Sequence, residues 1–255
     1  MKLGAQLYSV RDRVTTPEDL RTTLTELKKQ GYVNAQFSGV PLMGAEVWAK
    51  ISEETGMPIV CTHMPFDRIV NDTDSLIAEH KIFHCSVIGL GGMPNEYRGT
   101  LAGLEKFLEI MKEPVKKIRA AGMNFSYHNH WFEFESFSDA EGCAMDVMLE
   151  RCPDWLFLLD VAWAQFGKHS AAEYIRKIGS SRIVNVHFKD YTNPDTWNSL
   201  VPCGGGLVPF EEIIKACFEV GVENALVEQD TAPDTGDSIG QMAKSAEYLL
   251  PLLAN

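Results

Sequence analysis

The sequence predicts a single (β/α)8 TIM barrel, on the evidence of its length and of the spacing and form of its apolar runs. The chain has 255 residues, about the usual size of such a barrel. Eight short apolar runs start 26 to 42 residues apart, which leaves space each time for a strand, a loop and a crossover helix. Most of the runs are continuous rather than alternating, as expected for strands that are buried on both faces.

The predicted strands coincide with the eight apolar runs. In chain order they are Leu3–Tyr8, Val33–Phe37, Ile59–Thr62, Val87–Leu90, Asn124–Tyr127, Leu156–Leu159, Ile183–Val186 and Ala225–Val227. The stretches between them have the signals of helices, which are clearest in the first. There the sequence 16–19, Thr-Pro-Glu-Asp, predicts an N-cap followed by proline and acidic residues in the first turn. Leu20, Leu24 and Leu27 then share one face, and Gly31 predicts the end of the helix.

The eight units follow one another without an obvious linker, so residues 1–255 are expected to form one domain. A doubly wound open sheet is the alternative architecture. It is disfavoured because the first predicted strand lacks the glycine-rich turn that supports a dinucleotide site.

Composition excludes several classes of protein. The chain has 23 lysines and arginines against 35 aspartates and glutamates, a formal net charge of -12, and no dense basic run, so nucleic acid is not an expected partner. No apolar stretch approaches the length of a membrane span, and the N-terminal residues run directly into a strand without the pattern of a leader. The six cysteines are scattered, as is typical of small buried side chains in a reducing compartment, so the expected location is the cytoplasm.

Polar side chains follow the apolar runs, where a barrel of this class builds its active site. These residues are Gln6, Tyr8, His63, His128, His130, Asp160, His187, Lys189, Asp190 and Glu228. Asp160, His187 and Glu228 end three consecutive predicted strands and face His128 from the fifth. Two carboxylates and imidazole side chains in this arrangement predict a site for a divalent metal ion, Mn, Zn, Co or Mg.

Four segments resemble those of a known family. They are Thr62–Asp67 (THMPFD), Tyr127–Phe134 (YHNHWFEF), Val186–Asp190 (VHFKD) and Val227–Asp230 (VEQD). Together they resemble the sugar phosphate isomerase/epimerase family of the xylose-isomerase-like barrel superfamily. The resemblance extends along essentially the whole chain, strand by strand.

The resemblance implies a divalent metal ion with Asp160, His187 and Glu228 as ligands. Many members of the family have a glutamate where this chain has His128, so either His128 or Glu133 would complete the set. A histidine ligand would make the site one charge less negative and would favour Zn, Co, Ni or Mn over Mg.

The implied chemistry is proton abstraction next to the carbonyl group of a sugar or sugar derivative, with Glu228 as the base. His128 would return a proton, and Lys189 would neutralise developing charge or form a salt bridge at the rim. This predicts an isomerase or epimerase. Two alternatives stay open: a lyase or dehydratase acting on a keto-polyol or a 3-keto-glycoside, and a catalytically silent barrel that binds a sugar.

Five residues are predicted to contact substrate, and each also has a plain structural explanation as a loop anchor or packing residue. They are Gln6, Tyr8, His63, His130 and Trp163. Gly204–Gly206 predict either a mobile loop or backbone amides that bind phosphate, so phosphorylation of the substrate stays open, as does a homodimer. His80 and His84 lie four residues apart on a predicted helix and are expected at the surface.

Overall fold

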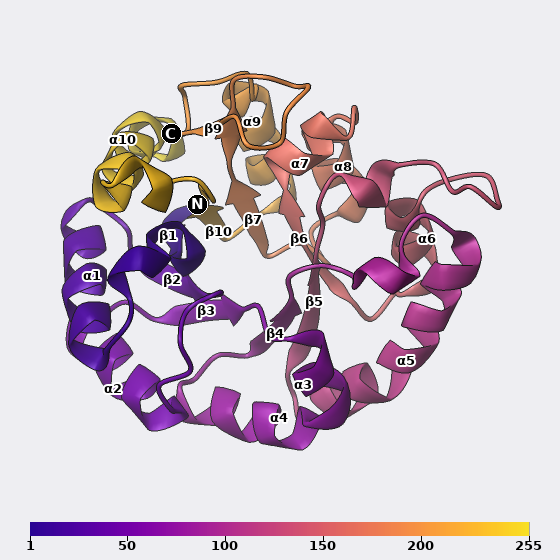
Figure 1. Cartoon of the computed structure of the whole chain (residues 1–255), viewed down its shortest axis with the longest axis horizontal. Coiled ribbons are helices and arrows are strands. Elements are labelled where there is room, and N and C mark those ends of the chain that lie inside the picture. Colours follow the sequence, from indigo (N-terminus) through magenta and orange to yellow (C-terminus); the bar gives the residue numbers. More distant parts are fainter. Residues whose placement is uncertain (255) are drawn as a thin grey trace.

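The computed structural model describes residues 1–254, whose longer strands form a parallel, nearly closed barrel surrounded by helices (Figure 1). In spatial order these strands are β3 (Ile59–Thr62), β2 (Asn34–Phe37), β1 (Lys2–Gln6), β10 (Asn224–Val227), β7 (Asn185–Phe188), β6 (Leu156–Asp160), β5 (Asn124–His128) and β4 (Val87–Leu90). A parallel bridge between Met64 and Leu90 brings β4 back beside β3. The predicted (β/α)8 TIM barrel is therefore confirmed.

The helices lie around the outside of the barrel, and α10 at the C-terminal end packs beside α1 (Figure 1). They are α1 (Pro17–Lys29), α2 (Ala45–Thr55), α3 (Phe66–Asn71), α4 (Thr73–Ile82), α5 (Leu101–Ala120), α6 (Ala144–Arg151), α7 (Val161–Phe166), α8 (Ala171–Ile178), α9 (Phe210–Val220) and α10 (Ser238–Leu253). Short 3-10 helices are η1 (Leu7–Arg13), η2 (Asn95–Tyr97), η3 (Phe132–Phe134) and η4 (Pro233–Thr235), and a small antiparallel ribbon consists of β8 (Asp190–Tyr191) and β9 (Leu200–Val201).

Each predicted strand is present, with two notable shifts at the ends. The first strand stops at Gln6 rather than Tyr8, because the Gln6 side chain accepts a hydrogen bond from the Tyr8 backbone N–H and starts η1. The seventh strand is Asn185–Phe188, two residues later than predicted. His187 therefore lies inside the strand rather than beyond its end.

The predicted signals of the first helix are also confirmed. Thr16 and Asp19 form a reciprocal capping box at the start of α1, which satisfies two free backbone N–H groups. Leu24 and Leu27 are fully buried, and Gly31 takes a φ of +99°, which ends the helix at little steric cost.

His80 corrects the expectation of a surface pair. It is buried at the end of α4, with Nε2 2.9 Å from Thr62 Oγ1 and Nδ1 2.7 Å from the Leu76 carbonyl oxygen, and only His84 is exposed. His80 belongs to the face of α4 that also buries Leu76, so its helical spacing already indicated a core position.

The interior of the barrel is layered from floor to mouth, because alternate residues of a strand point to the same face. On β10 the inward residues are Asn224, Leu226 and then Glu228 just beyond the strand. Leu226 belongs to a small apolar cluster with Val87 and Leu158. Apolar packing therefore separates a polar floor from the polar mouth.

Asparagine side chains form the polar floor. Asn34 Nδ2 donates to Asn224 Oδ1 at 2.7 Å, and Asn224 Nδ2 donates to Asn185 Oδ1 at 2.7 Å. Gly4 makes room for this ladder, since a Cβ there would lie 2.0 Å from Asn34 Oδ1. The ladder joins β2, β10 and β7 below the apolar layer.

The asparagine ladder predicts a large effect of Asn224→Ala on stability. The change leaves the Asn34 donor and the Asn185 acceptor buried without a partner, so the free energy of unfolding should fall by about 2–4 kcal/mol. Urea unfolding monitored by circular dichroism measures it. Asn95→Ala, at an exposed site, is the control and should change stability by less than about 0.5 kcal/mol. Equal effects of the two substitutions would contradict the role of the ladder.

Two further features of the described chain concern its helices and its cysteines. Within residues 1–254 no helix is both long enough and apolar enough to cross a membrane. All six cysteines lie in this described part of the chain, and each is buried with a free thiol.

Candidate functional site

Four buried side chains converge at the mouth of the barrel. They are the four predicted metal ligands: His128 at the end of β5, Asp160 at the end of β6, His187 in β7 and Glu228 directly after β10. One possible ligand atom from each lies within 4.8 Å of all the others. Parallel strands bring these residues together because their carboxyl ends meet at one rim. We call these four residues the mouth cluster.

Each histidine of the mouth cluster is held through the ring nitrogen that points away from the cluster. His187 Nε2 lies 2.5 Å from Gln36 Oε1, and His128 Nδ1 lies 3.0 Å from the carbonyl oxygen of Gly91. Both partners are oxygen atoms that only accept hydrogen bonds, so a neutral ring carries its proton on the held nitrogen. The other nitrogen then presents a lone pair to the cluster, as metal-binding histidines do.

The two carboxylates are held in the same way. Glu228 Oε1 accepts a hydrogen bond from Gln6 Nε2 at 2.5 Å, and Asp160 Oδ1 accepts one from the backbone N–H of Trp163 at 3.0 Å, where Asp160 caps α7. The remaining atoms, His128 Nε2, Asp160 Oδ2, His187 Nδ1 and Glu228 Oε2, are buried and face one another. His187 Nδ1 lies 2.8 Å from Glu228 Oε2, and His128 Nε2 lies 3.5 Å from Asp160 Oδ2. Nitrogen and carboxylate oxygen atoms that converge in this way fit a bound cation.

The charges around the mouth cluster also fit a divalent cation. Lys189 Nζ lies 2.9 Å from Glu228 Oε2, 3.2 Å from Asp160 Oδ2 and 3.1 Å from Asp230 Oδ2. Three carboxylates and one ammonium group leave a net charge of −2 when the imidazoles are neutral. A single divalent ion would balance that charge in a site where unbalanced charge is costly.

The protonation states agree with this charge count for most of the cluster. Burial raises the pKa of Asp160 and Glu228, but the Lys189 ammonium together with His128 and His187 outweighs burial and holds both pKa values well below their usual range. Burial lowers the pKa of His128, which favours the neutral ring. Burial also lowers the pKa of His187, but the Glu228 and Asp160 carboxylates together outweigh burial and raise that pKa. The carboxylates are therefore ionised at neutral pH.

A cavity of 520 Å³ opens above the mouth cluster. Four of the predicted substrate contacts line it: Gln6, Tyr8, His63 and His130. Trp163 does not line this cavity and is buried behind His130, with the two ring centroids 6.1 Å apart. The centroid of the Trp163 ring lies 4.6 Å from Lys189 Nζ. Direct contact of these residues with a substrate stays a prediction.

His63 presents an unpaired nitrogen near this cavity. Its Nδ1 lies 3.3 Å from Ser38 Oγ, whereas its Nε2 is buried with no hydrogen-bond partner in the described chain. Gly91 allows the ring to pack here, because a Cβ at that position would lie 3.1 Å from His63 Nδ1. Burial lowers the pKa of His63 well below its ordinary value, so the ring is neutral near pH 7.

Glu133, the alternative fourth ligand, is engaged elsewhere. Its Oε1 accepts a hydrogen bond from the Tyr127 hydroxyl at 2.5 Å, and its Oε2 accepts one from the His130 backbone N–H at 2.8 Å. Burial raises the pKa of Glu133 to about 7. The structure therefore brings His128, and not Glu133, into the mouth cluster.

Three residues near the site carry no predicted role in the sequence analysis. Gln36 holds His187, Asp230 pairs with Lys189, and Trp197 lines the cavity with 55% of its surface exposed. A polar residue within the buried run of β2 was the available signal for Gln36. Asp230 lies in a motif segment, but Trp197 lies in a loop without a periodic pattern.

Gly204–Gly206 do not offer free amides to a phosphate. Asp190 Oδ2 accepts hydrogen bonds from the N–H groups of Gly204 at 3.0 Å and Gly206 at 2.9 Å, and Asp190 Oδ1 accepts one from Val208 at 3.0 Å. A carboxylate of the protein therefore occupies the position that an anion would take.

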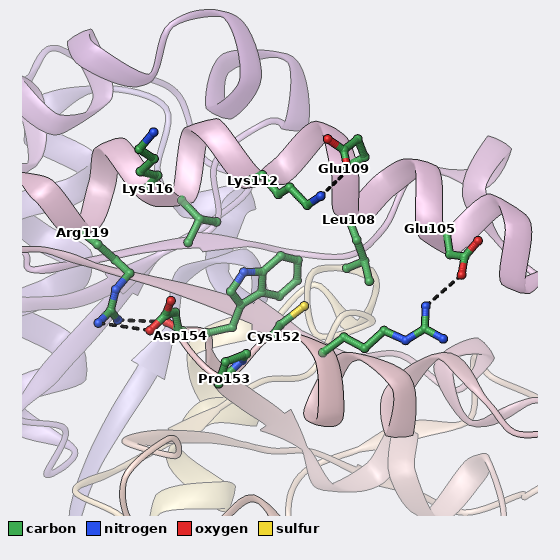
Figure 2. Close-up of a pocket in the computed structure, with 12 residues that line it drawn as sticks. Glu105, Leu108, Glu109, Lys112, Lys116, Arg119, Cys152, Pro153 and Asp154 are labelled. Carbon is green, nitrogen blue, oxygen red and sulfur yellow. Dashed lines mark hydrogen bonds and ion pairs between the residues drawn. The ribbon is translucent and has the colours of Figure 1, made fainter.

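A larger cavity, of 730 Å³, lies on the outer wall of the barrel between α5 and the segment 151–155 (Figure 2). Six of its charged side chains pair with one another: Lys112 with Glu109, Arg119 with Asp154, and Arg151 with Glu105. None of the four mouth-cluster residues lines it. Size alone therefore does not identify a candidate functional site, whereas four possible ligand atoms converge at the mouth.

Comparison with known proteins supports the fold. No family model and no curated protein matches the sequence. Among solved structures, a sugar phosphate isomerase/epimerase from Parabacteroides distasonis has a TM-score of 0.81 and 20% identity, covering 99% of this chain and 94% of that chain. The probable 3-DHS dehydratase AsbF from Bacillus anthracis has a TM-score of 0.75 and 13% identity, covering 98% of this chain and 99% of that chain. A D-allulose 3-epimerase from Methylomonas sp. has a TM-score of 0.73 and 12% identity, covering 99% of this chain and 98% of that chain.

Sequence identities this low support a similarity of fold but not a similarity of activity. Proteins described as xylose isomerase domain proteins are also among the similar structures, from Salmonella typhimurium and Alicyclobacillus acidocaldarius. The predicted resemblance to sugar phosphate isomerase/epimerase and xylose-isomerase-like barrels is thus confirmed as a likeness of fold.

The hydrogen bond from His187 predicts that Gln36 controls metal affinity. Gln36→Leu frees the ring to change its tautomer and orientation, so affinity for Mn²⁺ or Zn²⁺ should fall about 10–100-fold. Gln36→Glu keeps an oxygen acceptor and should retain the affinity. Isothermal titration calorimetry of the metal-stripped proteins measures both. Unchanged binding by Gln36→Leu would show that Gln36 does not orient a ligand.

The buried Glu133 carboxyl predicts a pH-dependent difference between wild type and Glu133→Gln. Its folded pKa of about 7 is above the ordinary value of 4.5, so its contribution to stability is complete at low pH and is lost as pH rises through 7. From about pH 4 to pH 8 the free energy of unfolding of the wild type should fall by about 3 kcal/mol relative to the variant. Urea unfolding across this range measures it. A difference that does not change with pH would contradict the raised pKa.

Proposed function

We propose that this protein is a divalent-metal-dependent isomerase or epimerase that acts on a sugar or sugar derivative by abstracting a proton next to a carbonyl group. The observation that carries the proposal is the mouth cluster, in which each side chain is held by one polar atom and presents another possible ligand atom to a common point. A cation site at the floor of an open cavity is suited to a small oxygen-rich substrate.

His128, Asp160, His187 and Glu228 would hold the ion. Of the two roles predicted for His128, we propose that of ligand, because Gly91 engages Nδ1 and Nε2 faces the mouth cluster. A bound divalent ion supplies Lewis-acid stabilisation of the negative charge that develops on a carbonyl oxygen. With two imidazoles in the set, Mn, Zn and Co suit the site better than Mg.

Glu228 is the proposed base, since it lines the cavity and is ionised. Gln6 fixes its carboxylate through Oε1, and Oε2 faces both the cluster and Lys189. The Lys189 ammonium would stabilise negative charge on a substrate oxygen. The neutral rings of His63 and His130, with Tyr8, would bind substrate hydroxyl groups, while Trp163 would support His130 from behind.

Elimination is the second candidate reaction. Its support is a cavity that continues past Trp197, which gives a leaving group room beyond the cluster. The same proton abstraction followed by loss of a β-substituent would make the protein a lyase or dehydratase of a keto-polyol or 3-keto-glycoside. The similar structures include both an epimerase and a probable dehydratase, so their activities support either reaction.

We propose a carbohydrate as the substrate, the cytoplasm as the location, and neither nucleic acid nor membrane as a partner. The six free thiols support the location, and the acidic composition disfavours nucleic acid. The absence of a membrane-spanning helix within residues 1–254 supports the last point. A homodimer is compatible with this proposal.

Glu228→Gln tests the reaction. The Mn²⁺-loaded wild type, incubated in D2O with a panel of ketoses, aldoses and keto-glycosides, should incorporate deuterium next to the carbonyl group of its substrate, followed by NMR. Replacing the base should slow incorporation about 10²–10⁴-fold. Glu223→Gln makes the same substitution at an exposed residue just before β10 and should change nothing.

The products separate the candidates. Changed stereochemistry or carbonyl position indicates isomerisation or epimerisation, whereas release of water or an aglycone indicates the lyase. A protein that binds no divalent ion and exchanges no proton with any member of the panel would contradict the enzymatic proposal and favour a silent sugar-binding barrel.

A further inference from the structure

A second cavity lies beside the one above the mouth cluster. It has a volume of 470 Å³ and shares Tyr8, Trp197 and Asp230 with the inner cavity of 520 Å³. Each volume alone lies within the range of small-molecule sites. The mouth of the barrel is therefore an extended cleft with an inner part over the cluster and an outer part beyond Trp197.

Trp197 stands at the junction on a loop that holds its own shape. The loop joins β8 to β9, and the Thr192 backbone N–H donates to the Ser199 carbonyl oxygen at 3.0 Å. The Ser199 hydroxyl lies 2.9 Å from the Asn193 carbonyl oxygen and 3.0 Å from that of Thr196. The Trp197 indole is 55% exposed, so much of its apolar surface contributes no burial energy to the fold. Held in this position, it offers a flat apolar face to a ligand.

Tyr8 is the second aromatic group of the cleft, and it too is held in place. The Arg11 guanidinium lies 3.9 Å from the centroid of the Tyr8 ring, and Arg11 Nη1 donates to the carbonyl oxygens of Tyr8 at 2.8 Å and Asp230 at 2.9 Å. A Cβ at Gly39 would lie 2.2 Å from the Tyr8 ring, so the ring packs directly on that glycine. Two fixed aromatic groups thus border both parts of the cleft.

The charges of the outer cavity select against an anion. Asp230 and Asp234 line it together with a single cation, Arg11, which its carbonyl and ring contacts already engage. The other lining groups include the neutral Asn198 and Thr235. Carboxylate and amide groups bind hydroxyl groups, and aromatic faces accept the apolar C–H face of a sugar ring. A phosphate group would meet net negative charge instead.

We propose that the outer cavity is a second sugar-binding subsite, bordered by Tyr8, Arg11, Trp197, Asn198, Asp230 and Thr235, so that the substrate is an uncharged disaccharide or glycoside with one ring over the mouth cluster and the next against Trp197. This inference rests on the proposed function for the inner ring. It identifies Trp197 as a residue that determines specificity for substrate length.

Calorimetric binding tests the subsite without turnover. The Mn²⁺-loaded wild type is titrated with trehalose, maltose, cellobiose and sucrose, and with their component monosaccharides glucose and fructose. At least one disaccharide should bind about tenfold more tightly than its own monosaccharides. In Trp197→Ala that advantage should disappear while monosaccharide affinity stays within about twofold. Trp197→Phe should restore part of it, because the ring is kept.

Phe218→Ala is the matched control, since it removes an aromatic side chain that is 40% exposed and lines neither cavity. It should leave all affinities unchanged. Equal affinity for disaccharides and monosaccharides, an equal loss of both in Trp197→Ala, or no binding of any member of the panel would overturn the subsite. Disaccharide binding that depends on Trp197, in a protein that exchanges no substrate proton, would uphold the subsite and overturn only the proposed reaction.

Discussion

The chemistry of this barrel depends on side chains that are each fixed at one polar atom and left free at another. Gln36 and Gly91 engage the outer nitrogens of His187 and His128, while Gln6 engages one oxygen of Glu228. Because the outer atoms are bonded, the inner atoms cannot turn away, and they face one another and the Lys189 ammonium. The result is a point at the mouth of the barrel where four possible ligand atoms converge.

The layers beneath this point protect it. The asparagine ladder and the apolar side chains above it, such as Leu226, fill the barrel from below. Access to the mouth cluster is therefore from the cavity side, where Tyr8 and Trp197 border the cleft. A ligand that fills this one entrance would exclude water from the mouth cluster.

Much of the fold and the four members of the mouth cluster were predictable from sequence, because both follow from one regularity. Apolar runs mark buried parallel strands, and polar residues at their ends meet at one rim, as Asp160 and Glu228 do. Gln36 escaped prediction because a polar residue within a buried strand does not by itself show that its side chain meets His187 across the barrel. Trp197 lies on a loop whose shape comes from its own hydrogen bonds. The choice between His128 and Glu133 required the position of Tyr127, which a linear sequence does not show.

The buried Lys189 ammonium has a consequence for how the protein matures. Proteins that gather several carboxylates at one point often fold only when a cation arrives to screen them. Here Lys189 contacts Asp160, Glu228 and Asp230 at once, so it screens their mutual repulsion from within the chain. The barrel can therefore fold without a cation, and the proposed ion would enter a site that is already formed. Loss of that ion would then leave the fold intact.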